Sequence, residues 1–247
     1  MKIKITIILI SILCLISCSD LNFFEDSTVS TKDFELEDFD QINIAANLHI
    51  TLNQSNENKH SIKGYEKQID QMQFIVANNV LTIEGNYKNF TKNYNTAQVT
   101  LNVKNLKNII CKKPCNINST NIIQIKNLNI ELMSSSQIVE TNLQLQCDSL
   151  IFLAAGSLAG KFTISGKCIK SNFTLNGLNS LHAGNLVCDT LSIINFSRGD
   201  HYVHATKKLT ATFQSGSNIY YKGNPETTVY YEKINSCLLY TSDAADE

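Results

Sequence analysis

Asp148 and Asp189 are the acidic residues whose type and spacing come nearest to a catalytic arrangement. Each follows a cysteine and begins a similar segment, Asp-Ser-Leu-Ile and Asp-Thr-Leu-Ser, so the two residues occupy equivalent positions in a repeat. Stacked repeats would separate the carboxylates by roughly 10 Å, which is loosely the spacing of an inverting carboxylate pair in a glycoside hydrolase. Few other acids lie between residues 106 and 224, and Arg198 is the only arginine of the chain. The sequence therefore favours surface turns at these aspartates and predicts no catalytic residues.

Five cysteines lie in the main body of the chain, an odd number that leaves at least one thiol without an intramolecular disulfide in an exported protein. They are Cys111, Cys115, Cys147, Cys168 and Cys188. The last three are spaced by 21 and 20 residues, which predicts an inward-facing row at one strand position of a stacked repeat. We favour a role as small buried hydrophobic side chains for this row. A disulfide between adjacent members stays open, because Cα separations of roughly 4.4–6.8 Å permit one.

No set of residues in the sequence has the spacing of a metal site. Cys111 and Cys115 are close in sequence, but a second ligand pair at a suitable spacing is missing, and the five histidines do not supply one. His201 and His204 lie three apart in a strand-like segment, so their side chains should point to opposite faces. The sequence therefore predicts no metal and no other cofactor.

Arg198-Gly199-Asp200 is the tripeptide that integrin ligands display on tight loops. A tripeptide arises readily by chance, and Gly199 can instead serve a sharp corner of the backbone, where glycine is sterically favoured. We favour the structural role and keep adhesion through Arg198, Gly199 and Asp200 as the weaker hypothesis.

The N-terminus has the features of a bacterial lipoprotein export signal. Two lysines precede an apolar run from Ile5 to Ile16, which is shorter than the roughly 20 residues that span a bilayer. The run ends in Leu15-Ile16-Ser17-Cys18, which resembles a lipobox. We therefore expect residues 1–17 to be a signal peptide and Cys18 to be the lipidated residue. Residues 18–35 would be a polar tether, with the membrane as partner through the lipid.

The last eleven residues, 237–247, depart in character from the rest of the chain. Back-translated codon by codon, they match the transposon-end adapter used in sequencing libraries. We therefore assign 237–247 to an adapter artefact and expect the natural chain to continue past Ser236. Cys237 then drops out of the cysteine count.

Composition restricts the class of partner. The formal net charge is −1, so there is no electrostatic case for a nucleic-acid partner. Residues 36–236 have the length of one all-β domain, since such domains reach roughly 200–250 residues. Asparagine, isoleucine, lysine and serine are abundant, a bias typical of low-GC genomes that carries little functional meaning.

Short runs that alternate apolar and polar residues dominate residues 36–236, as in Leu48-His-Ile-Thr-Leu52. Such runs, separated by Asn, Gly and Ser clusters, indicate strands, and there is no convincing helical periodicity over three turns. Similar apolar segments begin at Leu128, Leu150, Phe173 and Leu209. Together with the cysteine row they give a period of about 20 residues, which indicates a β-helix or β-solenoid whose units bury their apolar faces against each other.

Several strand and turn patterns resemble the head GIN domain family of auto-transporter adhesins, which is common in exported proteins of Bacteroidota. The likeness runs from Phe39 through Leu48–Leu52 to Asn78–Ile83, returns at Gln214–Pro225, and covers roughly residues 36–234. The resemblance implies a right-handed β-helix-like solenoid and no established catalytic residues. The sequence departs from the family in two ways. The Ser-Gly-Ser-Gly turns typical of the family are degraded here, and the final strand of small residues expected after Pro225 is missing.

We predict from these features a non-catalytic lipoprotein of the cell envelope, an adhesin-like module that binds a protein or a glycan along the flank of the solenoid. Stacked repeats suit this role because they present long, repetitive surfaces. Two alternatives stay open: a structural envelope protein without a ligand, and a polysaccharide-acting β-helix enzyme that would use Asp148 and Asp189. We expect anchoring at the outer membrane, with the periplasmic or the outer face left undecided.

Overall fold

The computed structural model describes residues 28–85, 96–133, 138–232 and 236–241. The elements are β1 (Val29–Phe34), β2 (Gln41–Ala45), β3 (Leu48–Gln54), β4 (His60–Tyr65), α2 (Glu66–Ile69), β5 (Met72–Ala77), β6 (Val80–Gly85), β7 (Ala97–Val103), β8 (Asn108–Cys111), β9 (Cys115–Ser119), β10 (Ile123–Met133), β11 (Ile138–Ala155), β12 (Ala159–Ser197), β13 (His201–Phe213), β14 (Ile219–Lys222), β15 (Glu226–Tyr231) and β16 (Leu238–Tyr240). Among these residues no helix has the length and hydropathy needed to cross a membrane. The expected signal peptide and Cys18 lie outside them.

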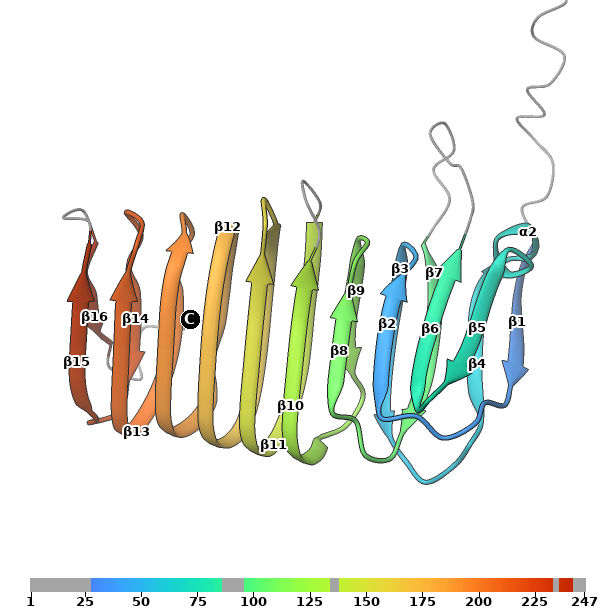
Figure 1. The fold of residues 1–247 in the computed structure, drawn as a ribbon, viewed down its shortest axis with the longest axis horizontal. Helices are drawn as coiled ribbons and strands as arrows, with labels where there is room; N and C mark the ends of the chain where they lie inside the picture. The colour runs from blue at the N-terminus through green and yellow to red at the C-terminus, as the bar shows by residue number, and fades with distance from the viewer. Residues whose placement is uncertain (1–27, 86–95, 134–137, 233–235, 242–247) are drawn as a thin grey trace, which may run out of the picture.

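The strands stack into a flattened β-solenoid whose axis runs along the longest dimension of the molecule (Figure 1). One row of strands contains β6, β2, β8 and β10, and the other contains β7, β3 and β9. The long strands β11, β12 and β13 bend around the corner and contribute to both rows. Neighbouring strands in these rows are parallel. The prediction of an all-β solenoid is confirmed, with about six turns.

The register between coils confirms a repeat of about 20 residues, since Cys147 pairs with Cys168. One alignment made from the sequence is wrong, because Phe173 lies beside Phe152 and not beside Leu150. Alternate side chains of a strand share a face, so a shift by two residues keeps the same side chains pointing inwards. Period-two alternation therefore identifies the strands without fixing how they pair.

The N-terminal end of the solenoid is built differently from the rest. β1 pairs antiparallel with β4, β4 with β7, and β5 with β6. The turn between β5 and β6 is Asn78-Asn79, with φ angles of 52° and 61°, as a two-residue type I′ hairpin requires. Asparagine tolerates this left-handed conformation better than most residues. The β1–β2 connection, residues 35–40, then crosses from this antiparallel layer to the first parallel strands (Figure 1).

Apolar side chains fill the space between the two rows in one continuous core. Phe152 is fully buried, and its ring centroid lies 5.0 Å from that of Phe162 and 6.0 Å from that of Phe173. Burying an apolar side chain of this kind stabilises the fold by about 1.5–3 kcal/mol. This aromatic cluster therefore anchors the middle coils.

Residues 238–240 form β16, which pairs in parallel with β14. An open strand edge can accept another strand-forming segment whatever its origin. The pairing therefore leaves the assignment of residues 237–247 to an adapter as a prediction.

Candidate functional site

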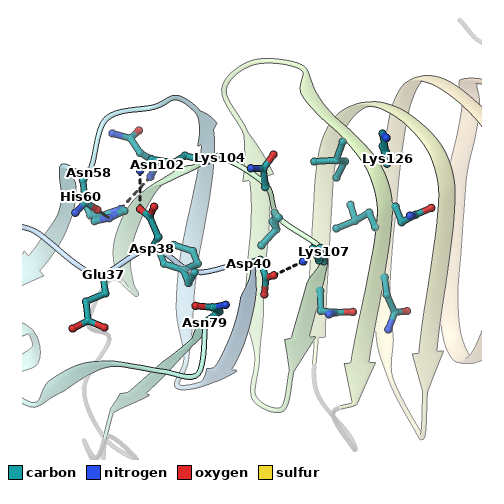
Figure 2. Close-up of a pocket in the computed structure, with 18 of the residues that line it drawn as sticks. Glu37, Asp38, Asp40, Asn58, His60, Asn79, Asn102, Lys104, Lys107 and Lys126 are labelled. Carbon is teal, nitrogen blue, oxygen red and sulfur yellow. Dashed lines mark hydrogen bonds and ion pairs between the residues drawn. The ribbon is translucent and has the colours of Figure 1, made fainter.

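A cleft of about 680 Å³ opens beside the β1–β2 connection (Figure 2). Its walls combine residues of that connection with residues from the corners of several coils. Apolar side chains, among them Phe39, Leu106 and Leu128, contribute to the lining. A volume of this size falls within the range of roughly 300–1,000 Å³ that is usual for ligand sites.

Two ion pairs hold the β1–β2 connection against the solenoid. Lys104 Nζ lies 2.7 Å from Asp38 Oδ1, and Lys107 Nζ lies 2.6 Å from Asp40 Oδ2. The backbone reinforces the second link, because Lys107 N donates a hydrogen bond to Asp40 O at 2.7 Å. Exposed ion pairs contribute only about 0–1 kcal/mol each. Their main consequence is that they position the connection and neutralise four of the charges around the cleft.

Three other charged side chains of the cleft, Glu37, Glu57 and Lys126, have no ion-pair partner within the part of the chain that the structure describes. Glu37 and Lys126 lie towards opposite ends of the site (Figure 2). Glu57 precedes Asn58, which Figure 2 shows on the side of Glu37. The cleft therefore offers a ligand one negative end and one positive end.

Asparagine is the most frequent residue type in the lining of the cleft. The seven that border the cleft are Asn58, Asn79, Asn102, Asn105, Asn108, Asn127 and Asn129. Four of them are engaged with protein groups, but Asn79, Asn105 and Asn127 make no side-chain hydrogen bond among the described residues. An amide both donates and accepts hydrogen bonds. These three amides are therefore available to a ligand.

His60 lies beside the cleft and is only 2% exposed. Its Nδ1 accepts a hydrogen bond from Asn102 N at 3.2 Å, so the proton sits on Nε2, which lies 3.3 Å from Asn58 Oδ1. Burial, followed by the charge of Lys104, lowers the pKa of His60. The ring is therefore neutral near pH 7, and it orients Asn58 and Asn102.

A second hollow of about 740 Å³ continues from the cleft along the corner of the solenoid. The two share Asn105, Ile125 and Lys126, and the second extends as far as Asp189. The cleft and this hollow therefore form one groove across successive coils, which we call the corner groove.

Asp148 and Asp189 both border the corner groove, but Asp189 does not have the raised pKa of a general acid. Lys207 Nζ lies 2.7 Å from Asp189 Oδ2. This hydrogen bond, helped by the Thr206 hydroxyl, lowers the pKa of Asp189. A general acid in a glycoside hydrolase needs a raised pKa. Asp189 therefore acts as an ion-pairing residue of the corner.

Arg198, Gly199 and Asp200 form the corner between β12 and β13. Asp200 Oδ1 accepts a hydrogen bond from Asn218 N at 2.9 Å. Gly199 packs so closely on the neighbouring coil that an added Cβ would lie 2.1 Å from Asn179 O. These contacts give Gly199 and Asp200 structural roles, while adhesion through the tripeptide stays a prediction.

The cysteines fall into two groups. Cys111 and Cys115 form a disulfide across the turn between β8 and β9. Cys147, Cys168 and Cys188 are buried thiols, and the first two pair in register as the expected row requires. Within the described ranges no cluster of three or more potential ligands could hold a metal ion.

A buried polar cluster around His201 was not found from the sequence. His201 is fully buried and His204 faces outwards, so the predicted opposite orientation is confirmed. His201 Nδ1 accepts a hydrogen bond from Leu181 N at 3.1 Å, which leaves Nε2 to donate to Asn195 Oδ1 at 3.0 Å. Asn195 Nδ2 donates in turn to Ser217 Oγ at 2.7 Å. The alternating pattern predicts that the side chain of His201 points inwards. It does not show that His201, Asn195 and Ser217 are hydrogen-bonded to one another.

A stack of parallel coils with a ligand-sized groove along one corner defines a β-solenoid domain suited to binding. The chain belongs to the family described as "Putative auto-transporter adhesin, head GIN domain", which matches residues 38–225. The resemblance noted in the sequence is therefore confirmed.

Several solved structures share the fold. A putative adhesin from Bacteroides fragilis NCTC 9343 has a TM-score of 0.77 and 20% sequence identity, covering 87% of this chain and 98% of that one. A putative lipid binding protein from Parabacteroides distasonis ATCC 8503 has a TM-score of 0.63 and 18% sequence identity, covering 87% of this chain and 98% of that one. A putative adhesin from Parabacteroides merdae ATCC 43184 has a TM-score of 0.59 and 19% sequence identity, covering 87% of this chain and 97% of that one. Comparison with the curated proteins gives no match.

Proposed function

We propose that the protein is a non-catalytic, adhesin-like binding module, anchored at the outer membrane through a lipid on Cys18, and that its ligand binds in the cleft. Family membership and the names of two similar structures support an adhesin-like class of protein. The apolar run that ends in Ser17-Cys18 supports the lipid anchor.

The cleft is the observation that carries this proposal, and its chemistry favours a glycan. The amides of Asn79, Asn105 and Asn127 can each donate and accept, which matches the hydroxyl groups of a sugar. Glu37 and Lys126 can form charge-assisted hydrogen bonds, which are about twice as strong as neutral ones. The apolar part of the lining can pack against the C–H face of a sugar ring.

Other ligands fit the cleft less well. The name of the Parabacteroides distasonis structure refers to lipid binding, but the three available amides and the charged residues at both ends of this cleft favour a polar ligand. A structural envelope protein without a ligand and a polysaccharide-acting enzyme are the remaining alternatives. The binding experiment below separates them.

Replacing the cleft residues Lys126 or Asn127 with alanine is expected to weaken glycan binding by about tenfold each. Each substitution removes a hydrogen bond worth about 1–1.5 kcal/mol in net binding energy. Wild type is first screened on a glycan array, and the best ligand is then titrated into each variant by calorimetry.

Lys161→Ala is the matched control, since Lys161 is an exposed lysine outside the cleft and should bind the glycan like wild type. An empty array, or equal affinities for wild type and both cleft variants, would count against the cleft as a glycan site. Shortening of a bound polysaccharide that Asp148→Asn abolishes would instead favour the enzyme.

Cys18→Ala is expected to move the protein from the membrane fraction to the soluble fraction and to abolish acyl labelling. Two or more acyl chains are needed for stable membrane anchoring, and this substitution removes their attachment point. The measurement is fractionation of cells labelled with a fatty-acid analogue, with Cys14→Ala as control, because Cys14 lies inside the apolar run. A Cys18→Ala protein that stays labelled and membrane-bound would refute the anchor.

A further inference from the structure

The thiols of Cys147 and Cys168 lie in contact on adjacent coils. The two residues are partners in the parallel register of β11 and β12, and their Sγ atoms are 3.3 Å apart. Neighbouring strands of a sheet lie about 4.7–4.9 Å apart, which falls within the Cα separation of roughly 4.4–6.8 Å that a disulfide spans. A small rotation of the side chains would therefore bring the sulfurs to bonding distance without moving the backbone.

The same two cysteines lie at the wall of the corner groove. Cys147 is 6% exposed and Cys168 is 5% exposed, and both border the second hollow of the corner groove. Cys188, the third member of the row, has 0% exposure and does not border it. Its sulfur accepts a hydrogen bond from Ser171 Oγ at 3.2 Å. The groove therefore borders the first two cysteines of the row and not the third.

The central sulfur of the row is also the one best prepared for attack. Cys147 Sγ donates a hydrogen bond to Cys168 Sγ, and this contact is the main cause that lowers the pKa of Cys168. The pKa of Cys147 is raised, because its proton is held by the sulfur of Cys168. Thiolates and not thiols attack disulfides, so Cys168 is the nucleophile and Cys147 is the second thiol.

We propose that Cys147 and Cys168 are a modification site, at which a disulfide donor entering the corner groove is exchanged for a disulfide that joins two neighbouring coils. Cys168 Sγ attacks one donor sulfur, the donor S–S bond breaks, and the other donor sulfur leaves as a thiolate. Cys147 Sγ then loses its proton and attacks Cys168 Sγ, which expels the second donor sulfur. The two cysteine sulfurs are oxidised by two electrons and the donor disulfide is reduced to two thiols. One donor sulfur takes the proton of Cys147 and the other takes a proton from water.

The cross-link can be read directly by peptide mapping. The purified folded chain is incubated with oxidised glutathione, its remaining thiols are blocked by alkylation, and it is digested with trypsin without reduction. Cleavage after Lys126, Lys161, Lys167 and Lys170 places the two cysteines in separate peptides, 127–161 and 168–170. We expect these two peptides to be recovered as one disulfide-linked species, with Cys188 alkylated in the peptide that begins at Ser171.

Two variants test the assigned roles. Cys188→Ser should form the same cross-link, whereas Cys147→Ser should stop at a mixed disulfide between glutathione and Cys168. Recovery of Cys147 and Cys168 as alkylated thiols from wild type after oxidation would overturn the proposal, as would a cross-link between Cys168 and Cys188. The wild-type result stands by itself, so the test does not depend on the folding of either variant.

Discussion

Lowering the pH from 7 towards 4 is expected to destabilise the folded chain strongly, because His201 must stay neutral in the core. Burial lowers the pKa of His201 to about 3 from an ordinary value of 6.5. Between these two pH values the unfolded chain binds a proton at this position and the folded chain does not. Since stability rises with pH wherever the unfolded state holds more protons, stability falls as the pH drops below 6.5.

The size of this effect follows from the pKa difference. Each unit of pKa shift corresponds to about 1.4 kcal/mol, so the full loss between pH 6.5 and pH 3 is about 4–5 kcal/mol. Asp189 affects stability only at lower pH. Its pKa lies below the ordinary value of 3.8, so its contribution to stability is lost as the pH falls below that value. The loss above pH 4 therefore reports mainly on buried histidines.

Urea unfolding followed by circular dichroism between pH 4 and pH 7.5 measures this dependence. His201→Gln should flatten it, at some cost in stability at pH 7, because a glutamine cannot bind the proton. His204→Gln is the matched control, since His204 faces outwards on the same strand. An unchanged pH dependence in His201→Gln would show that other groups cause the loss.

Phe152→Ala is expected to lower the free energy of unfolding by about 3–5 kcal/mol. Truncating a buried phenylalanine removes its transfer energy and leaves a cavity that the neighbours refill only in part. Phe152 contacts both Phe162 and Phe173, which sit on the next coil. Coils between two fixed neighbours have little freedom to close a gap of that size.

Urea denaturation at pH 7 measures this loss. The slope of the unfolding free energy against urea concentration should be the same for the variant and for wild type. Phe196→Ala is the control, because Phe196 is 43% exposed and substitutions at such surface positions usually change stability by about 0.5 kcal/mol or less. A loss under about 1 kcal/mol for Phe152→Ala would mean that the aromatic cluster does not anchor the middle coils.

The repeat architecture could be predicted from the sequence because its signals are local. Alternation identified strands from residue 36 onwards, and the spacing of Cys147, Cys168 and Cys188 gave the length of a coil. Val29–Phe34, expected to lie in the polar tether, form β1 instead, because they pair with β4. The pairing of Phe173 was wrong by two residues, since a two-residue shift preserves every inward side chain. The antiparallel N-terminal layer could not be predicted either, because the residue pattern of a strand does not show whether its partner runs parallel or antiparallel to it.

The cleft could not be predicted for a different reason. Its lining comes from residues as distant in sequence as Glu37 and Ile151, which only the stacking of coils brings together. Composition misled as well, because the abundance of asparagine was assigned to a genomic bias. The structure gathers seven asparagines at one site, and no property of the sequence distinguishes Asn105 or Asn127 from the others.

The order in which the strands stack also sets an order in which the chain can fold. β2 pairs with β6 and β3 pairs with β7, so the first layers are complete once Val103 has been made. From β8 onward each coil adds to the coil before it. A repeat stack can nucleate at one end and propagate. The chain can therefore wind up one coil at a time, using its finished part as the template for the next turn.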